Sequence, residues 1–190
     1  MGKERTADWY DEKVLKNKRM FKTLEKSPWK PLYYTCADLI FEKENRILDL
    51  GCGSGRFAKL LKIKGFKNYL GIDFSKVLID EAKRYIPDYS FLLNDIFDED
   101  IQKLFSDFDI FVMLELLEHI ERDLELLKSI PKNKIIILSV PNFDSAAHVR
   151  WFNSMEDVIH RYKELIDIKI MKTVVYSNKK EAYVIRGIRK

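Results

Sequence analysis

The stretch that decides the fold is Ile47-Leu48-Asp49-Leu50-Gly51-Cys52-Gly53-Ser54-Gly55-Arg56-Phe57-Ala58. Apolar strand formers lead into three glycines spaced two residues apart, and a helical pattern of apolar residues follows at once. The sequence therefore predicts a buried strand, a tight turn and a helix. Glycine suits such a turn because the backbone visits angles that other residues avoid, and because a ligand can lie against bare main chain. We expect a small ligand to bind at this corner.

The carboxylate that precedes the glycines indicates which ligand binds. Nicotinamide and flavin sites usually read Gly-x-Gly-x-x-Gly, with a pyrophosphate at the helix N-terminus, whereas the order here is Asp-x-Gly-x-Gly-x-Gly. A fixed negative charge at Asp49 suits an ammonium or sulfonium ligand better than a diphosphate. Asp73 ends the next predicted strand, where a carboxylate can accept bonds from both ribose hydroxyls. Together the two carboxylates predict a ligand that has a ribose and a cation.

Four segments of the chain resemble the class I S-adenosylmethionine (SAM) dependent methyltransferases, and the resemblance runs from about Arg46 to the C-terminus. The segments are Leu48-Asp49-Leu50-Gly51-Cys52-Gly53-Ser54-Gly55, Gly71-Ile72-Asp73-Phe74-Ser75, Asn94-Asp95-Ile96 and Leu116-Leu117-Glu118-His119-Ile120. The resemblance implies a Rossmann-like α/β fold, with a seven-stranded sheet that is mostly parallel, a C-terminal antiparallel hairpin and helices on both faces. It also implies SAM as cofactor and S-adenosylhomocysteine as product.

The resemblance further implies how this cofactor is held. In the family the acidic residue after the third strand contacts the adenine amino group and the next apolar side chain lies on the ring, which assigns these roles to Asp95 and Ile96. A desolvated carboxylate that accepts an N–H bond can select adenine; the alternative for Asp95 is a turn or helix-capping role. The residues expected at the SAM site are Asp49, Gly51, Cys52, Gly53, Gly55, Asp73, Phe74, Asp95, Ile96, Leu114 and Tyr10.

The composition fits one domain, since the chain has 190 residues of which 46% are hydrophobic. No apolar run approaches the roughly 18 residues of a membrane span, and the N-terminus lacks the apolar core of a signal peptide, so we expect no membrane partner and a cytoplasmic location. Two cysteines do not predict a disulfide framework. The net charge of +4 leaves nucleic acid as a candidate partner, although solvated surface lysines are the simpler interpretation. The sequence does not indicate an oligomeric state.

Within this single domain of residues 1–190, residues 1–43 are expected to form an N-terminal helical cap on a SAM-binding core of residues 44–190. We expect one helix from Ala7 to about Glu25 and a second helix from Pro31, a favourable first-turn residue. One face of the second helix carries a buried stripe of Leu32, Cys36, Leu39 and Ile40.

Aromatic side chains are frequent in the cap. In SAM enzymes of this kind the N-terminal helices often cover the cofactor and shape the substrate pocket, so Tyr10 and Tyr33 are the rings we expect in a lid. The alternative is that these rings pack the helices onto the sheet.

Near-continuous apolar runs at Asp109–Met113 and Lys134–Val140, separated by helical patterns, indicate a parallel sheet that is covered on both faces. Ligands of such sheets bind beyond the carboxyl ends of the strands. The segment from Leu114 to Ile120 and the loop of residues 141–152 are therefore expected at the site. Beyond a helix from Ser154, a hairpin is expected with strands Ile168–Tyr176 and Ala182–Ile188 around the turn Ser177-Asn178-Lys179-Lys180.

Methyl transfer from a sulfonium mainly requires that nucleophile, methyl group and sulfur are held in line. A base is needed only if the acceptor proton has a high pKa, and the candidates are Glu115, His119 and His148. If residues 115–119 are helical, Glu115, Glu118 and His119 share one face.

The pattern Glu-x-x-Glu-His also resembles the metal-binding segment of ubiquinone-pathway O-methyltransferases and of the enzymes that methylate small-RNA 3′ ends. The sequence does not favour a metal. If one is bound, Glu115, Glu118 and His119 are the candidate ligands, with His148 as a fourth, and Mn²⁺ or Zn²⁺ suits this set better than Mg²⁺.

Residues of the acceptor site are predicted from the loop after the fifth strand and from the cap. Arg150 could grip an acceptor carboxylate or phosphate through its bidentate fork, with His148 and Tyr33 nearby; the alternative for Arg150 is a salt bridge. The predicted function is SAM-dependent methyl transfer to an oxygen or nitrogen of a small molecule, because the chain has no appended recognition domain. The alternatives are an RNA or protein methyltransferase and a non-catalytic SAM-binding subunit.

Overall fold

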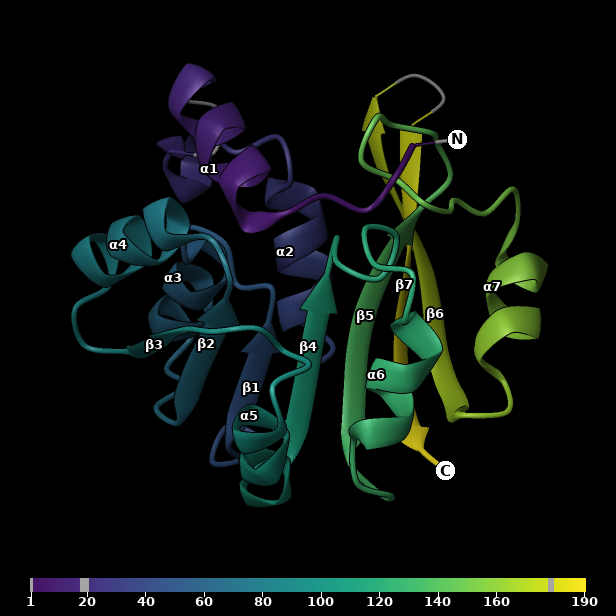
Figure 1. Cartoon of the computed structure of the whole chain (residues 1–190). Coiled ribbons are helices and arrows are strands. Elements are labelled where there is room, and N and C mark those ends of the chain that lie inside the picture. Colours follow the sequence, from purple (N-terminus) through teal and green to yellow (C-terminus); the bar gives the residue numbers. More distant parts are fainter. Residues whose placement is uncertain (1, 18–20, 178–179) are drawn as a thin grey trace.

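Seven strands form one sheet in the computed structural model of the chain, which describes residues 2–17, 21–177 and 180–190. The order across the sheet is β3-β2-β1-β4-β5-β7-β6 (Figure 1). The strands are β1 (Ile47–Leu50), β2 (Tyr69–Asp73), β3 (Ser90–Leu93), β4 (Ile110–Leu114), β5 (Ile135–Pro141), β6 (Ile166–Ser177) and β7 (Lys180–Arg189).

The strands from β3 to β5 pair in parallel, whereas β7 is antiparallel to both β5 and β6. This confirms the predicted Rossmann-like sheet and its C-terminal hairpin. The hairpin strands are longer than predicted, and residues 178 and 179 of the predicted turn lie outside the described residues.

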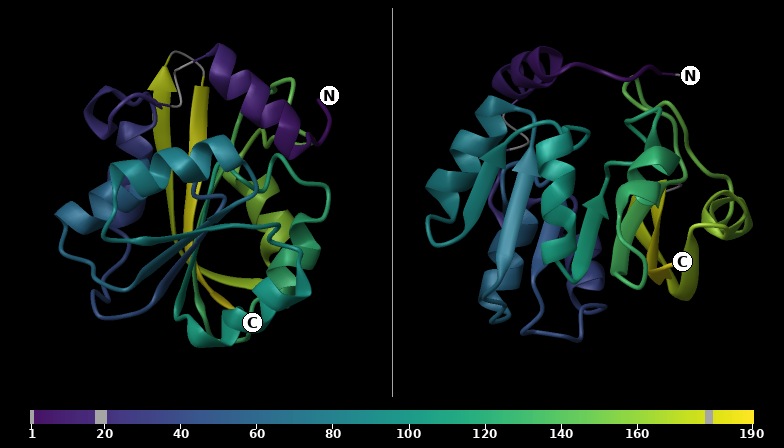
Figure 2. Two further views of the ribbon diagram at one scale, coloured as in Figure 1. Left: turned by 60° about the vertical axis from the view of Figure 1, so that its left-hand side comes forward. Right: turned by 60° about the horizontal axis from the view of Figure 1, so that its bottom comes forward.

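Helices cover both faces of the sheet (Figures 1 and 2). One core cluster joins the sheet to α2 (Lys30–Ala37), α3 (Arg56–Ile63) and α4 (Lys76–Tyr85). The other joins it to α5 (Glu99–Lys103), the 3-10 helix η3 (Leu104–Asp107), α6 (Asp123–Ser129) and α7 (Met155–Tyr162). Because side chains alternate along a strand, Ile47 belongs to the first cluster and Leu48 to the second. The side chains of Leu32, Cys36, Leu39 and Ile40 are buried as predicted, but only Leu32 and Cys36 lie on α2, because the helix ends at Ala37.

The N-terminal segment departs from the prediction of one helix to Glu25. Helix α1 (Ala7–Lys16) ends earlier because Asn17 turns to an extended backbone, and Leu24–Lys26 forms a separate 3-10 helix, η2. Val14 is the buried residue of α1, so the helix has little apolar surface to hold a longer run against the core.

The same segment crosses the carboxyl edge of the sheet, above the arrowheads of the parallel strands (Figures 1 and 2). At one end, Asp11 accepts hydrogen bonds from the Ser75 hydroxyl and from the Val77 N–H (3.4 Å) at the start of α4. At the other end, Arg5 donates to the Ala146 carbonyl (2.8 Å) in the loop after β5. The segment therefore bridges both sides of the edge where ligands are expected. No helix within the described ranges is long and apolar enough to cross a membrane.

Candidate active site

The glycine turn between β1 and α3 has the backbone that the sequence predicts. Gly51, Gly53 and Gly55 have φ angles of 74°, 55° and 77°, in the left-handed region that favours glycine. A Cβ at Gly51 would lie 2.9 Å from Leu116 Cδ1, and one at Gly55 would lie 2.7 Å from Ile86 Cδ1. A Cβ at Gly53 would have no neighbour within 4 Å. Bare main chain therefore faces open space at Gly53.

Two buried carboxylates flank this turn. Asp49 is 3% exposed and accepts a hydrogen bond from the Tyr69 hydroxyl (2.7 Å); burial raises its pKa to about 7. Asp73 is 7% exposed and accepts the N–H groups of Gly53 and Ser75, both at 2.9 Å; burial raises its pKa to about 6. A cation near either group would favour its charged form.

The other predicted cofactor residues lie along the same edge. Ile96 and Leu114 are buried, and Phe74 is 39% exposed. Cys52 is buried, with its Sγ 2.8 Å from the position that a Cβ at residue 71 would take, which explains the glycine there. Asp95 is exposed, and its side chain accepts the Phe97 N–H (2.9 Å).

Two tyrosines of the cap occupy different environments. The Tyr10 ring on α1 lies 5.5 Å from the Phe74 ring and 6.0 Å from the His119 ring, measured between centroids. It therefore stands between the cofactor edge and the segment after β4. Tyr33 packs 6.0 Å from the Phe57 ring against the core, and burial raises its pKa to about 12. For Tyr33 these contacts favour the packing alternative over a place in the acceptor site.

The segment after β4 is a series of turns rather than the helix that the prediction considered. Glu115 has a positive φ of 54°, which turns its side chain away from the direction that a helix would give. Its carboxylate accepts hydrogen bonds from Trp29 Nε1 (3.3 Å), the Ser139 hydroxyl (3.3 Å) and the Tyr176 hydroxyl (2.9 Å). Burial raises the pKa of Glu115, and these three bonds oppose the rise. The three partners lie 86, 24 and 61 residues from Glu115 along the chain, so no local pattern could have indicated them.

Glu118, His119 and His148 instead form a cluster, in which one ligand atom from each residue lies within 4.8 Å of the others. Glu118 is completely buried, and neither of its carboxylate oxygens has a hydrogen-bond partner among the described residues. His119 Nε2 lies 3.9 Å from Glu118 Oε1, beyond hydrogen-bond distance. A buried carboxylate without a partner is costly.

Both imidazoles of the cluster are held by their Nδ1 atoms. His119 Nδ1 lies 2.9 Å from the Ala147 carbonyl, and His148 Nδ1 lies 2.9 Å from the Phe143 carbonyl. Because a carbonyl only accepts, each Nδ1 carries the proton and each Nε2 keeps a lone pair. Burial lowers the pKa of His119 to about 4 and also lowers that of His148, while burial and then Glu115 raise the pKa of Glu118. Both rings are therefore neutral at pH 7.

The cluster shares Glu118, His119 and His148 with the candidate metal ligands of the sequence analysis, but Glu115 is not part of it. Glu115 is engaged by Trp29, Ser139 and Tyr176, and His148 takes its place beside Glu118 and His119. Two neutral imidazole nitrogens and a carboxylate are a donor set that Mn²⁺ or Zn²⁺ accepts, and an Nδ1–H bonded to a carbonyl is usual for histidines that bind metal through Nε2. The residues present therefore fit a divalent metal.

Comparison with known proteins identifies the family. A methyltransferase domain family matches residues 20–167. The chain belongs to this methyltransferase family. The match includes the glycine turn, both buried carboxylates and all three residues of the Glu118 cluster.

The chain is also similar to a curated relative and to solved structures. The ubiquinone biosynthesis O-methyltransferase of Rickettsia conorii is 34% identical over 109 residues, which are 54% of this chain and 37% of that protein. The chain thus spans well under half the length of this relative. Magnesium protoporphyrin IX methyltransferase from Synechocystis, solved with bound S-adenosylhomocysteine, matches with a TM-score of 0.76 at 13% identity, over 97% of this chain and 98% of that one. The [4+2]-cyclase SpnF matches with a TM-score of 0.75 at 10% identity, over 99% and 98%. At these identities the structures share the fold.

The guanidinium of Arg150 is engaged by neighbouring main chain and by a buried carboxylate. It donates to the carbonyls of Leu117, Ile120 and Glu121 and lies 3.3 Å from Asp123 Oδ1. These contacts favour the structural alternative over the predicted role as a ligand of the acceptor.

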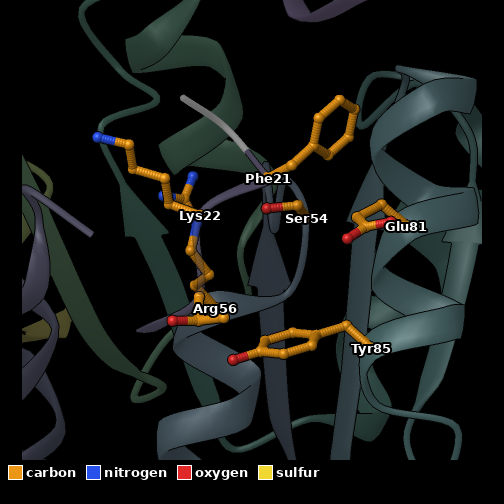
Figure 3. Close-up of a pocket in the computed structure, with 7 residues that line it drawn as sticks. Phe21, Lys22, Ser54, Arg56, Glu81 and Tyr85 are labelled. Carbon is orange, nitrogen blue, oxygen red and sulfur yellow. The ribbon is translucent and has the colours of Figure 1, made fainter. Parts of the chain in front are cut away.

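A small pocket lies beside the glycine turn, between the cap and α4 (Figure 3). It is lined by Phe21, Lys22, Thr23, Ser54, Arg56, Glu81 and Tyr85. Arg56 is buried and donates to the Ser27 hydroxyl (3.1 Å), and the Tyr85 hydroxyl accepts the Leu24 N–H (3.3 Å). The lining includes none of the predicted cofactor residues, so the pocket marks where the cap docks.

Proposed function

We propose that the chain is a SAM-dependent methyltransferase that transfers the methyl group to an oxygen of a small molecule. The observation that carries this proposal is the glycine turn with the buried carboxylates Asp49 and Asp73 beside it. Asp49 supplies the negative charge that a sulfonium compound requires, and Asp73 has lone pairs left for the ribose hydroxyls. The name of the Rickettsia conorii relative supports oxygen as the acceptor atom.

The other residues of this edge complete the binding site. Asp95 and Ile96 take the adenine, with Asp95 accepting from its amino group, and Leu114 and Phe74 border the nucleoside. Helix α1 covers the cofactor, and Tyr10 separates it from the Glu118 cluster. With methyl donor and acceptor held in line under this cover, positioning supplies most of the rate.

The Glu118 cluster lies on the acceptor side of Tyr10 and acts on the acceptor oxygen. The neutral Nε2 atoms of His119 and His148 can each accept the hydroxyl proton as it leaves. The same three residues would hold a divalent metal, which, when bound, lowers the pKa of an acceptor hydroxyl. The completely buried Glu118, without a partner among the described residues, supports the metal.

Two alternatives remain distinct from this proposal. An RNA or protein methyltransferase would draw on the net charge of +4, and RNA binding of this kind would weaken steeply with salt. A non-catalytic SAM-binding protein would share the fold, since a fold alone does not determine an activity: the chain is also similar in fold to a cyclase.

The test begins with binding. Isothermal titration calorimetry with SAM and S-adenosylhomocysteine should give binding of both ligands, and Asp73→Ala should abolish it. Transfer of tritiated methyl from SAM is then measured into a cell extract separated into metabolites, RNA and protein. Label in the metabolite fraction supports the proposal, and label confined to RNA or protein contradicts it. Binding without any transfer favours the non-catalytic alternative.

Metal content is tested separately. Purified protein is analysed for bound metals, and its turnover is measured before and after chelation. Full turnover by metal-free protein would exclude the metal and leave His119 or His148 as the base.

A further inference from the structure

The Glu118–His119–His148 cluster is built from two loops that have no regular structure. Glu118 and His119 follow β4, and His148 follows β5. Side chains on loops hold a ligand well only when other contacts fix their backbone. The contacts between these two loops therefore determine whether the cluster is preformed.

Two hydrogen bonds join the loops directly. The Val149 N–H donates to the Glu118 carbonyl (2.8 Å), and His119 Nδ1–H donates to the Ala147 carbonyl (2.9 Å). Ala147 and Val149 are the chain neighbours of His148, so these two bonds set the position of His148 relative to Glu118 and His119. The centroids of the His148 and His119 rings lie 4.9 Å apart.

The third connection is the guanidinium of Arg150. Its Nη1 donates to the carbonyls of Leu117 and Ile120, and its Nη2 donates to the Glu121 carbonyl (3.1 Å). These carbonyls lie on both sides of Glu118 and His119, in turns whose backbone makes no ladder with a strand or helix. A planar guanidinium can bond several carbonyls at fixed angles, whereas a lysine ammonium cannot reproduce that fork. Arg150 therefore fixes the turns that carry two of the three cluster residues.

Asp123 in turn holds Arg150. The Asp123 side chain is 1% exposed and lies 3.3 Å from Arg150 Nη2. The same carboxylate accepts two bonds from Arg161, at 2.7 and 2.6 Å, and one from the Tyr162 hydroxyl at 3.0 Å. Tyr162 is completely buried on α7, so its hydroxyl anchors Asp123, and with it Arg150, to a packed helix. Arg161, whose side chain is 32% exposed, pairs with the same carboxylate but is not needed for this anchor.

We propose that Arg150, held by Asp123, is a positioning residue that presets Glu118, His119 and His148 for the metal or acceptor that they bind. The inference rests on the proposed role of this cluster. The Arg150 guanidinium bonds carbonyls around residue 120 and Asp123, and none of these residues is assigned to the cofactor, so its loss should change the cluster and leave SAM binding intact.

Arg150→Lys is the test variant, because lysine keeps the charge and the aliphatic stem. Arg161→Lys is the matched control, since Arg161 bonds the same carboxylate from α7, outside both loops. Thermal melting by circular dichroism establishes that both variants fold. Mn²⁺ binding is then measured by electron paramagnetic resonance, and SAM binding by calorimetry.

Arg150→Lys should raise the Kd for Mn²⁺ by about tenfold to a hundredfold, the usual effect of losing an outer partner of metal ligands. Its Kd for SAM should equal that of the native protein, and Arg161→Lys should change neither constant. An unchanged Mn²⁺ affinity in Arg150→Lys, or an equal loss in Arg161→Lys, would overturn the inference.

A second readout needs no metal. The proton on His119 Nδ1 bridges the two loops, whereas the proton on His148 Nδ1 bonds within its own loop. In proton–nitrogen spectra of the metal-free protein, the His119 ring signal should be lost to water exchange in Arg150→Lys and kept in Arg161→Lys, and the His148 signal should stay in both. If the native protein binds no Mn²⁺, the proposal that the cluster holds a metal is wrong. The two ring signals then test on their own whether Arg150 positions the cluster. A His119 signal that persists in Arg150→Lys contradicts it.

Discussion

The indole N–H of Trp29 donates to a carboxylate oxygen of Glu115 across 3.3 Å and joins the cap to the end of β4. The Ser139 and Tyr176 hydroxyls donate to the other oxygen. One carboxylate thus collects donors from the cap, from β5 and from β6, at a residue whose φ of 54° is uncommon for glutamate. This arrangement holds the start of the segment that leads to Glu118.

Tyr176→Phe should destabilise the protein because it removes the shortest of these bonds from a buried carboxyl. The expected loss is about 1 to 3 kcal/mol in the free energy of unfolding, measured by urea denaturation. Tyr183→Phe is the control, since its hydroxyl donates to a main-chain carbonyl, that of Asn153, at 3.2 Å. Equal losses of unfolding free energy in the two variants would show that the bond from Tyr176 to Glu115 contributes no more to stability than a hydrogen bond to a main-chain carbonyl.

Stability without cofactor should fall as pH rises through the range in which the buried carboxylates ionise. The pKa values of Asp49 and Asp73 are raised to about 7 and about 6, so the native state holds these protons more tightly than the unfolded chain. Their contribution to stability is therefore present below about pH 4 and is lost through about pH 6 to 7. Thermal melting across this range should show the fall, and Asp49→Asn should reduce it. A flat profile for the native protein would contradict the burial of both groups.

SAM affinity should follow the opposite course. The ionised carboxylates attract the sulfonium and accept the ribose hydroxyls, so calorimetry should show tighter binding as pH rises from about 5 to about 8. In Asp49→Asn binding should be weaker and less dependent on pH. Affinity that is constant across this range in the native protein would argue against carboxylates as the ligand-binding groups.

The structural features that could be predicted from the sequence are those that residues close together in the chain determine. Strand, turn and helix around Gly51 follow from residues that are adjacent in the chain, and the parallel sheet follows from its apolar runs. The environment of Glu115 could not be predicted in this way, because Trp29 and Tyr176 lie 86 and 61 residues away. A helix over residues 115–119 would have placed Glu115 and Glu118 on one face. The hydrogen bonds from distant residues hold Glu115 in a different backbone conformation.

Arg150 shows the same limit for the candidate site. Its residue type and loop position fit an anion-binding role, and nothing nearby in the sequence distinguishes that role from bonds to the carbonyls around residue 120. The end of α1 at Lys16 was missed because the apolar pattern continues to Leu24, which is buried through a separate turn. His148, predicted as a possible fourth ligand, does lie beside Glu118 and His119, because the carboxyl ends of β4 and β5 are neighbours in the sheet.

Asp11→Ala should weaken SAM binding with little effect on stability. Asp11, on α1, accepts hydrogen bonds from Ser75 and Val77 at the start of α4. Because Val14 is the one buried residue among the described residues of α1, the packing of α1 against the rest of the protein depends on such polar contacts. Losing a cap-like contact of about 1 kcal/mol should raise the Kd for SAM about fivefold by calorimetry. Glu12→Ala is the control, because Glu12 is exposed and bonds Lys16 on the same helix. If both variants bind SAM like the native protein, α1 does not cover the cofactor.

Gly53→Ala should separate cofactor binding from folding. Gly53 and Gly65 both have positive φ angles, 55° and 86°, and a Cβ at either position would meet nothing within 4 Å in the cofactor-free chain. Alanine should therefore cost a similar conformational strain at both positions, about 1 to 2 kcal/mol in the free energy of unfolding. Only the methyl group at residue 53 would project where the cofactor lies against the main chain, so Gly53→Ala should lose SAM binding and Gly65→Ala should keep it. SAM affinity that survives in Gly53→Ala would mean that the ligand does not approach the turn at this residue, and the assignment of the glycine turn as the cofactor site would fail with it.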